Sequence, residues 1–254
     1  MMLNDAFILL VRKNSLSFLI CSLAIFTKSV FANEQIVVAV GLAKPPYVIQ
    51  QNNSGFELEL LRNVFQKMGK LTKFVYTSFG HSSKMLEVKE IDAIMTTNQY
   101  VVSDTSKLSN TYITYQNVAI SLKENNLSIN TINDLANYSM ASFQKADKVL
   151  GPEFSIAAKQ SPLHLKIGEQ KKQPILLLKK RVDVLIMDIN IFKYLIKELG
   201  LESIDEKFTF HFIFPKSSYQ VAFKNKENIS MFNNALANYQ NSEAYLLLKE
   251  RYNF

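Results

Sequence analysis

Short continuous apolar runs alternate along the chain with longer segments in which apolar residues recur at helical spacing. The first run, Ile36 to Val40, is rich in β-branched residues and is typical of a buried strand in an α/β sheet. A loop follows from Gly41 to Asn53, in which Pro45-Pro46 keeps the backbone extended ahead of Tyr47. The pattern therefore predicts a strand that leads into a loop carrying an aromatic side chain.

A helix is predicted directly after this loop. Ser54 stands three residues before Glu57, which is the spacing of a capping box, and Gly69 ends the helix. The residues at helical spacing are Phe56, Leu60, Leu61, Val64, Phe65 and Met68. Ligands of open α/β sheets bind at the carboxyl ends of the strands, where Tyr47 would lie. The alternative is that Tyr47 only packs over the sheet edge.

The same alternation continues to the end of the chain. Further strands are predicted at Lys73 to Thr77, Asp92 to Thr96, Tyr138 to Phe143, His164 to Ile167, Val182 to Met187, Phe208 to Phe214 and Tyr219 to Phe223. Helices are predicted near Ser82 to Lys89, Lys145 to Leu150, Gln173 to Lys180, Ile189 to Leu199, Ile229 to Asn238 and Ser242 to Arg251. Alternating strands and helices imply parallel sheets. Two such series, joined by strand-like crossings near Tyr115 and Phe210, predict two lobes with a cleft between them.

The first 32 residues have the pattern of a secretory signal peptide. Arg12 and Lys13 precede the apolar run Ser15 to Phe26, which is too short to span a bilayer, and small residues near Ala32 suit cleavage. We therefore expect residues 1–32 to be removed on export to the periplasm. Cys21, the only cysteine, lies in this segment, so the mature chain would contain no disulfide and no cysteine ligand.

Charge and motifs exclude several classes of function. Loss of residues 1–32 would lower the formal net charge from +7 to +5, and the lysines are scattered rather than gathered in the basic stripe of a nucleic-acid-binding protein. His81, His164 and His211 lack the spacing of metal ligands. No GxSxG, HExxH or P-loop motif is present. We expect no nucleic-acid partner, no metal and no cofactor.

A set of short motifs occurs in order between Glu34 and Phe254. The motifs are Pro46-Tyr47, Gly55-Phe56-Glu57, Ile91-Asp92-Ala93-Ile94 with Thr96-Thr97, Ile132-Asn133-Asp134-Leu135, Arg181 to Asp188, Phe232 to Leu236 and Lys249 to Tyr252. In this set the chain resembles the bacterial extracellular solute-binding proteins of family 3, whose known members largely serve amino-acid ABC transporters. The resemblance implies an α/β, two-lobed periplasmic-binding-protein (type II) fold with two hinge strands. Residues 33–115 and 211–254 would form lobe 1, and residues 116–210 would form lobe 2.

The resemblance also implies where a ligand binds. Tyr47 and Phe79 match aromatic residues beside the ligand, and Thr96 and Thr97 match residues that meet a ligand carboxylate. Asp188 matches an acid that holds a ligand ammonium. Phe79 could instead be a core residue, and Asp188 could be only the N-cap of the helix after it.

Two features of the amino-acid-binding members are missing here. Their arginine after the threonine pair, which grips the α-carboxylate with a bidentate fork, has no counterpart between Asn98 and Asn110. The glycine-containing loop that opens a second-lobe helix reads Phe143 to Ala146. Lys145 either replaces the arginine as a point charge or is a solvated residue at the helix start. An ordinary α-amino acid is therefore not the expected ligand.

The function expected from these features is capture of a small polar, amine-bearing ligand by lobe closure. The protein would act as a periplasmic monomer that serves an ABC permease in the inner membrane, and it would not be an enzyme. A sensor or protein-interaction module with an altered or decayed site is one alternative. The other is a cyclic-acid dehydratase on the same fold, with Glu57 or His81 as the acid or base.

Overall fold

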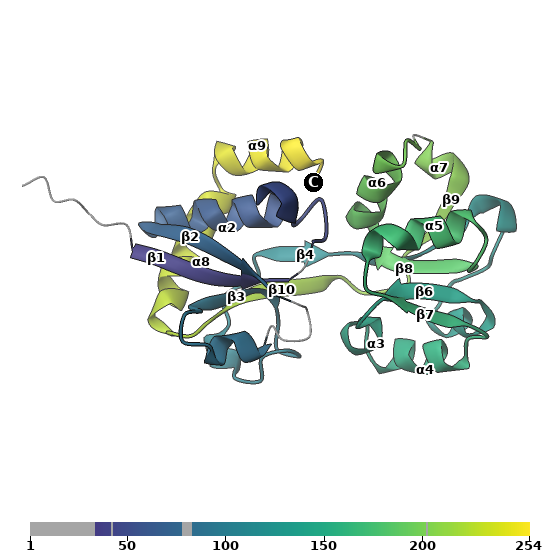
Figure 1. Ribbon diagram of the computed structural model, residues 1–254, viewed down its shortest axis with the longest axis horizontal. Coiled ribbons are helices and arrows are strands. Elements are labelled where there is room, and N and C mark those ends of the chain that lie inside the picture. Colours follow the sequence, from purple (N-terminus) through teal and green to yellow (C-terminus); the bar gives the residue numbers. More distant parts are fainter. Residues whose placement is uncertain (1–33, 42, 78–82, 202) are drawn as a thin grey trace, which may run out of the picture. The chain divides into compact units, whose positions relative to one another are not determined.

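The computed structural model describes residues 34–41, 43–77, 83–201 and 203–254. The predicted signal peptide, Phe79 and His81 lie outside these residues. The described chain forms two five-stranded sheets with helices packed on them (Figure 1). Each sheet contains parallel strand pairs, which confirms the prediction of an α/β fold. Each sheet also contains antiparallel pairs.

The first sheet has the strand order β2-β1-β3-β10-β4. Its strands are β1 (Glu34–Val40), β2 (Lys70–Tyr76), β3 (Ala93–Thr97), β4 (Ile113–Tyr115) and β10 (Ser217–Phe223). β1 pairs in parallel with β2 and β3, as the alternation of strands and helices predicts, whereas β10 runs antiparallel to β3 and β4. β3 is buried along its whole length, which explains its continuous apolar run.

The second sheet has the strand order β7-β6-β8-β5-β9. Its strands are β5 (Asn117–Leu122), β6 (Met140–Phe143), β7 (His164–Ile167), β8 (Val184–Asp188) and β9 (Phe208–His211). β6 is parallel to β7 and β8, and β5 is antiparallel to β8 and β9. In this register Asn117 lies opposite Asp188, so the start of β5 lies beside the end of β8.

Helices and 3-10 turns connect the strands. The helices are α2 (Phe56–Lys67), α3 (Ala146–Val149), α4 (Pro152–Gln160), α5 (Gln173–Leu178), α6 (Ile189–Glu198), α7 (Ile204–Lys207), α8 (Glu227–Gln240) and α9 (Glu243–Tyr252). The 3-10 turns are Gln50–Asn52, Ser83–Glu87, Thr105–Lys107, Lys123–Asn125, Asn133–Asn137 and Gln170–Lys172. α2 packs against β2, α8 and α9, and α5 packs against β5, β6 and β8.

Two predictions about local structure need correction, and two helices were not predicted. The helix expected near Ser82 to Lys89 is only a 3-10 turn over Ser83–Glu87. The structure also contains α4 and α7, which the sequence pattern did not indicate; Gly151 is the N-cap of α4 and Pro152 begins it. The capping box at the start of α2 is also wrong, because Ser54 Oγ donates to Asn52 Oδ1 (2.6 Å) instead of capping the helix.

Backbone carbonyls take the place of the missing side-chain cap on α2. The amide of Phe56 donates to Pro46 O (2.9 Å), and the amide of Glu57 donates to Tyr47 O (3.0 Å). The intervening Gly55 has φ 117°, and a Cβ atom there would lie 2.4 Å from Tyr47 O. Only glycine therefore fits where the loop meets the helix. The side chain of Glu57 takes no part in capping α2.

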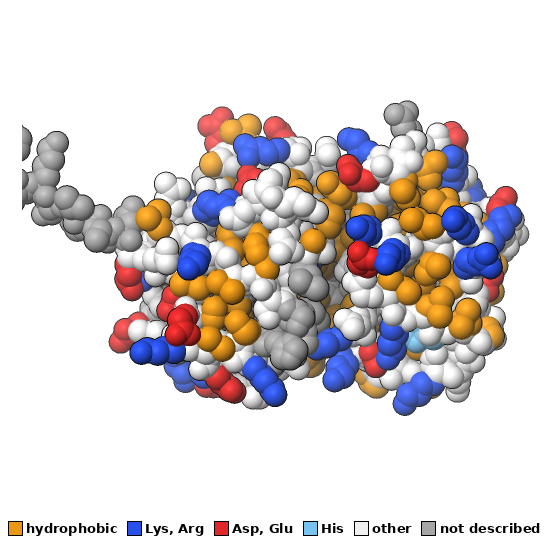
Figure 2. Space-filling model, viewed as in Figure 1, with side chains coloured by type: hydrophobic (Ala, Val, Ile, Leu, Met, Phe, Trp, Pro, Cys, Tyr) orange, Lys and Arg blue, Asp and Glu red, His pale blue; other side chains and the backbone are white. Residues whose placement is uncertain are grey.

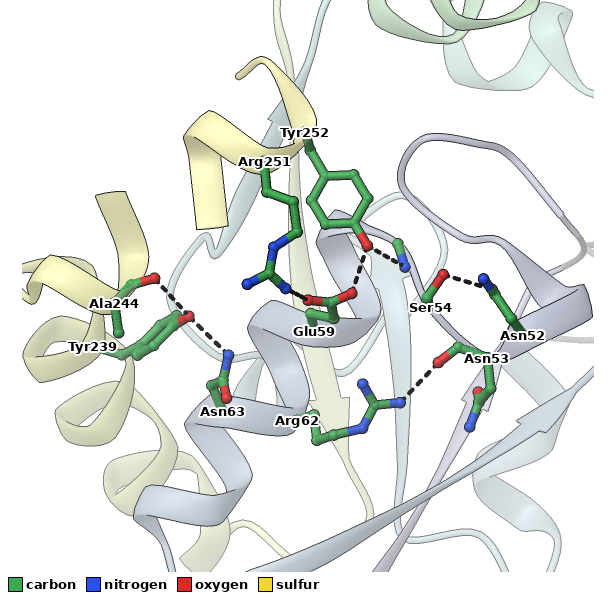
Figure 3. A network of polar contacts seen from close by, with 11 residues as sticks. Asn52, Asn53, Ser54, Glu59, Arg62, Asn63, Tyr239, Ala244, Arg251 and Tyr252 are labelled. Carbon is green, nitrogen blue, oxygen red and sulfur yellow. Dashed lines mark hydrogen bonds and ion pairs between the residues drawn. The ribbon is translucent and has the colours of Figure 1, made fainter. Parts of the chain in front are cut away.

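A polar network ties α9 to the start of α2 (Figure 3). The Tyr252 hydroxyl donates to Glu59 Oε1 (2.5 Å) and accepts from the Gly55 amide (3.0 Å). Arg251 forms an ion pair with the same carboxylate at 2.8 Å. The carboxyl-terminal helix thus satisfies the backbone donor of Gly55, the N-cap residue of α2.

Replacement of Tyr252 with phenylalanine should lower the free energy of unfolding by about 1–3 kcal/mol, because the Gly55 amide would lose its acceptor. Urea denaturation would measure the change. Tyr245→Phe is the matched control, since the Tyr245 ring also packs against Phe56 but its hydroxyl makes no hydrogen bond within the described residues. The control should change stability by less than about 0.5 kcal/mol. Equal effects of the two substitutions would contradict the prediction.

Two segments join the sheets, one between β4 and β5 and the other between β9 and β10. Gln116 lies in the first of them, and its Nε2 atom donates to Phe214 O in the second (3.0 Å). The backbone amide of Gln116 donates to Asp188 Oδ2 (2.9 Å). The two connections are therefore hydrogen-bonded to each other and to the end of β8.

Candidate functional site

A cavity of about 140 Å³ is lined by residues of both sheets. The first sheet and its loops contribute Gly41, Ala43, Lys44, Met95, Thr96, Tyr115 and Tyr219. The second sheet and its loops contribute Asn117, Phe143, Gln144, Lys145, Val149, Gly168, Gln170, Asp188 and Ile191. The cavity thus combines aromatic rings with charged side chains from both sheets.

Lys44 reaches the cavity from a tight turn after β1. The amide of Lys44 donates to Val48 O (3.0 Å), and the Lys44 carbonyl accepts from the Tyr47 and Val48 amides. Lys44 is only 8% exposed, and its charge is paired: the Nζ atom lies 3.0 Å from Glu57 Oε2 and donates to Thr96 Oγ1 at 2.8 Å. The ammonium also lies 5.0 Å from the ring centroid of Tyr115. Lys44 is therefore a buried, paired cation in the cavity wall.

Glu57, on the first turn of α2, is the centre of this cluster. Its side chain is completely buried and accepts hydrogen bonds from Thr96 Oγ1 (2.5 Å), the Tyr115 hydroxyl (2.7 Å) and the Tyr112 hydroxyl. With Lys44, four donors satisfy the carboxylate, as a buried charge requires. Glu57 does not line the cavity.

The electrostatics of the cluster follow from its burial. Burial lowers the pKa of Lys44, while the Glu57 charge and hydrogen bond act in the opposite direction. Burial and the Glu57 charge raise the pKa values of Tyr112 and Tyr115 well above their ordinary range. Both phenols therefore stay protonated and continue to donate to Glu57.

Asp188, at the end of β8, also forms part of the cavity wall. Its Oδ1 atom accepts from the Tyr47 hydroxyl (3.1 Å) and from the amides of Asn190 (2.9 Å) and Ile191 (3.1 Å). Asp188 is thus the N-cap of α6, and the same carboxylate also lines the cavity. Among the described residues, only the backbone amide of Gln116 donates a hydrogen bond to Oδ2.

Burial raises the pKa of Asp188 to about 6, although the hydrogen bonds from Ile191, Gln116 and Tyr47 act to lower it. The side chain is 3% exposed, so its ionised form lacks the solvation that water would give. A positive group in the cavity would supply a part of that missing stabilisation.

Only some of the predicted site residues line the cavity. Thr96, Lys145 and Asp188 line the cavity. Tyr47 lies behind the lining, completely buried and stacked on Tyr115 at a centroid distance of 3.9 Å. Thr97 is outside the lining, because neighbouring strand residues point to opposite faces of the sheet and Thr96 faces the cavity. The buried hydroxyl of Thr97 has no hydrogen-bond partner among the described residues. Phe79 lies outside the described residues.

Sequence reasoning missed the Lys44–Glu57 pair as a feature of the site. One signal for Glu57 was available, because Glu57 precedes Leu60, Leu61 and Val64 at spacings of three, four and seven residues. It therefore lies on the apolar face of α2, where a carboxylate needs buried partners. No comparable signal marks Lys44, Tyr112 or Tyr115, since their contacts depend on how distant segments pack.

A second, larger hollow of about 710 Å³ is bordered by α6, the segment after it and the end of α9. Its charged residues are Lys193, Lys197, Glu198 and Arg251, and all of them are exposed. The smaller cavity instead holds Lys44 and Asp188, which are buried and have defined partners. We therefore take the smaller cavity as the candidate site.

The described histidines have structural contacts. His164 bonds Ser142 Oγ (2.8 Å), and His211 bonds Ser121 Oγ (3.0 Å) and Ile129 O (3.2 Å). The part of the chain that the structure describes contains no group of three or more His, Cys, Asp or Glu side chains suited to a metal ion. In the same part, no helix combines the length and the apolar character needed to cross a membrane. On the face shown in Figure 2, Lys and Arg side chains are scattered among acidic ones.

Solved structures with a similar fold include proteins of more than one function. An ancestral arginine-binding protein bound to arginine has 19% identity and a TM-score of 0.68, over 86% of this chain and 97% of that one. An ABC uptake transporter substrate-binding protein from Streptococcus pneumoniae with bound histidine has 18% identity and a TM-score of 0.68, over 87% and 93%. A histidine kinase sensor domain with similarity to periplasmic binding proteins has 16% identity and a TM-score of 0.67, over 87% and 96%. At these identities the likeness shows the two-lobed fold alone.

The sequence itself identifies the family. No curated protein sequence matches the chain. Residues 36–254 match the family of bacterial extracellular solute-binding proteins, family 3. The match spans nearly all of the described residues and confirms the resemblance that the ordered motifs indicate. The chain therefore belongs to the bacterial extracellular solute-binding proteins, family 3.

Proposed function

We propose that this protein is a periplasmic receptor that captures a small polar, amine-bearing ligand in the cavity between the two sheets. Asp188 carries the proposal, because it is an almost completely buried carboxylate that lines the cavity. Its Oδ2 atom accepts one hydrogen bond from the described residues, and a carboxylate oxygen can accept a second. A ligand ammonium would supply both that bond and a countercharge.

The proposed contacts involve both parts of the fold. Thr96 would meet the ligand from lobe 1 (33–115 and 211–254), and Lys145 and Asp188 would meet it from lobe 2 (116–210). Tyr47 would act by positioning Asp188 through its hydroxyl, which also accepts from Asn190 Nδ2 at 3.1 Å. A ligand that touches both lobes favours their closed arrangement by its differential affinity for that state.

Family membership supports the rest of the proposal. Extracellular solute-binding proteins act outside the cytoplasm, so export through the signal peptide at residues 1–32 and delivery to an ABC permease form the proposed setting. A dehydratase with Glu57 as its acid or base is not supported. The Glu57 carboxylate is completely buried, is held by four donors and does not line the cavity.

A thermal-shift screen tests the proposed function. The purified protein would be heated with amino acids, amines, polyamines, opines, dicarboxylates, cyclic acids and short peptides. A ligand at one hundred times its dissociation constant adds about 2.7 kcal/mol of stability, and Asp188→Asn should abolish the shift caused by an amine-bearing hit. Asparagine keeps an acceptor for the first amides of α6 but removes the charge.

Asp183→Asn is the matched control for this screen. Asp183 is also a partly buried carboxylate, and it accepts from the Ser139 amide (2.9 Å) and the Ser139 hydroxyl (2.6 Å), but it does not line the cavity. The control should keep the ligand-induced shift at its wild-type size. A hit that survives Asp188→Asn, or a folded wild-type protein that no compound stabilises, would count against the proposal.

A further inference from the structure

The charge of Lys44 is compensated inside the protein. Of the described residues that line the cavity, Lys44 and Lys145 are the cations, and Lys44 is the one that the first sheet contributes. An unpaired buried ammonium would attract a ligand carboxylate. Here the ammonium lies 3.0 Å from Glu57 Oε2 and donates to Thr96 Oγ1. Lys44 therefore offers the cavity far less positive charge than its residue type suggests.

Glu57 cannot easily give up this pairing. Three hydroxyl groups, one from β3 and two from the segment that contains β4, fix its carboxylate in addition to Lys44. Movement of Lys44 toward a ligand would leave a completely buried carboxylate without its countercharge, which proteins avoid. A carboxylate placed against Lys44 would also lie close to the negative charge of Glu57, where the low local dielectric strengthens repulsion.

Apart from Lys145, the charged and aromatic groups of the remaining walls favour a positive group. Asp188 contributes a carboxylate, and Phe143 and Tyr219 contribute aromatic rings, which attract cations through their faces. Both groups suit an ammonium. The arginine residues of the described chain, Arg62, Arg181 and Arg251, do not line the cavity.

From this arrangement we infer that Glu57 determines ligand specificity by neutralising Lys44, so that the site selects amines without an α-carboxylate over the corresponding amino acids. The inference rests on the proposed function and names its ligand class. Glu57 acts through Lys44 and not by touching the ligand. It takes the place at Lys44 that a ligand carboxylate would otherwise occupy.

Matched ligand pairs test the inference on the wild-type protein. The pairs are arginine and agmatine, lysine and cadaverine, histidine and histamine, and tyrosine and tyramine, each compared by thermal shift and by titration calorimetry. The amine should bind at least tenfold more tightly than its amino acid in every pair that binds. An equal or reversed preference would overturn the inference and leave the proposed receptor function intact. No binding by either member of any pair would overturn both.

Variants then test the role of Glu57. Glu57→Gln should release the Lys44 charge and improve the affinity for the amino-acid member at least tenfold relative to its amine. Lys44→Met/Glu57→Gln is the matched control, since it removes the same carboxylate without leaving an unpaired ammonium, and it should show no such gain. A folded Glu57→Gln variant with unchanged preference would overturn the role of Glu57. If that variant does not fold, the wild-type comparison still decides the ligand class.

Discussion

Replacement of Glu57 with alanine will lower the free energy of unfolding by about 3–5 kcal/mol, the cost of removing one partner of a buried ion pair. The substitution leaves the Lys44 ammonium without a countercharge. It also leaves the hydroxyls of Thr96, Tyr112 and Tyr115 without their common acceptor. Urea denaturation of the wild-type protein and the variant would measure the difference.

Two comparisons make this prediction specific. Lys44→Met should cost less than Glu57→Ala, because three hydroxyls would still donate to the carboxylate. Glu34→Ala removes a carboxylate that is 77% exposed and pairs with Lys70 at 2.7 Å, and such surface pairs contribute about 0–1 kcal/mol. A loss below about 1 kcal/mol for Glu57→Ala would show that the cluster does not hold the buried charge described here.

The second large effect is a loss of stability as the pH rises from about 4 to about 6. The pKa of Asp188 is about 6 in the folded protein, against an ordinary value of 3.8. Between these values the folded state retains a proton that the unfolded state has released, so the free energy of unfolding falls as the pH rises. The contribution is fully present below pH 4 and is lost above pH 6, and it amounts to roughly 3 kcal/mol.

Other groups act in the opposite direction and must be subtracted. Burial lowers the pKa values of His164 and His211, and hydrogen bonds from Asn130 and Thr131 lower the pKa of Asp134. Each of these groups makes stability rise with pH. The test is therefore the difference between the wild-type protein and Asp188→Asn, measured by chemical denaturation across this range. Parallel curves for the two proteins would refute the assignment to Asp188.

The sequence pattern indicated most of the strands and helices, because strand and helix periodicities are local. Continuous apolar runs correctly indicated the buried strands β1, β3 and β8. The same pattern indicated Asp188 only as an N-cap, and the resemblance to the family was what suggested it as a ligand residue. The alternation of strands and helices also indicated the parallel pairs of both sheets.

Predictions failed where contacts between distant segments override local signals. Ser54 and Glu57 have capping-box spacing, but the carbonyls of Pro46 and Tyr47 already satisfy the first amides of α2. Glu57 is then drawn into the interior by partners up to 58 residues away. The charge balance of the cavity could not be predicted from sequence for the same reason, since it depends on which buried groups meet Lys44.

The position of β10 has a consequence for how the chain folds. β10 lies between β3 and β4, although its Gln220 and its partner Thr97 in β3 are far apart in sequence. All strands of the second sheet come from the intervening stretch, residues 117–211. Pairings across such long separations form slowly because loop closure must come first. We expect the second sheet to form early and the first to remain incomplete until residues 217–223 insert, so the amino-terminal strands finish folding last.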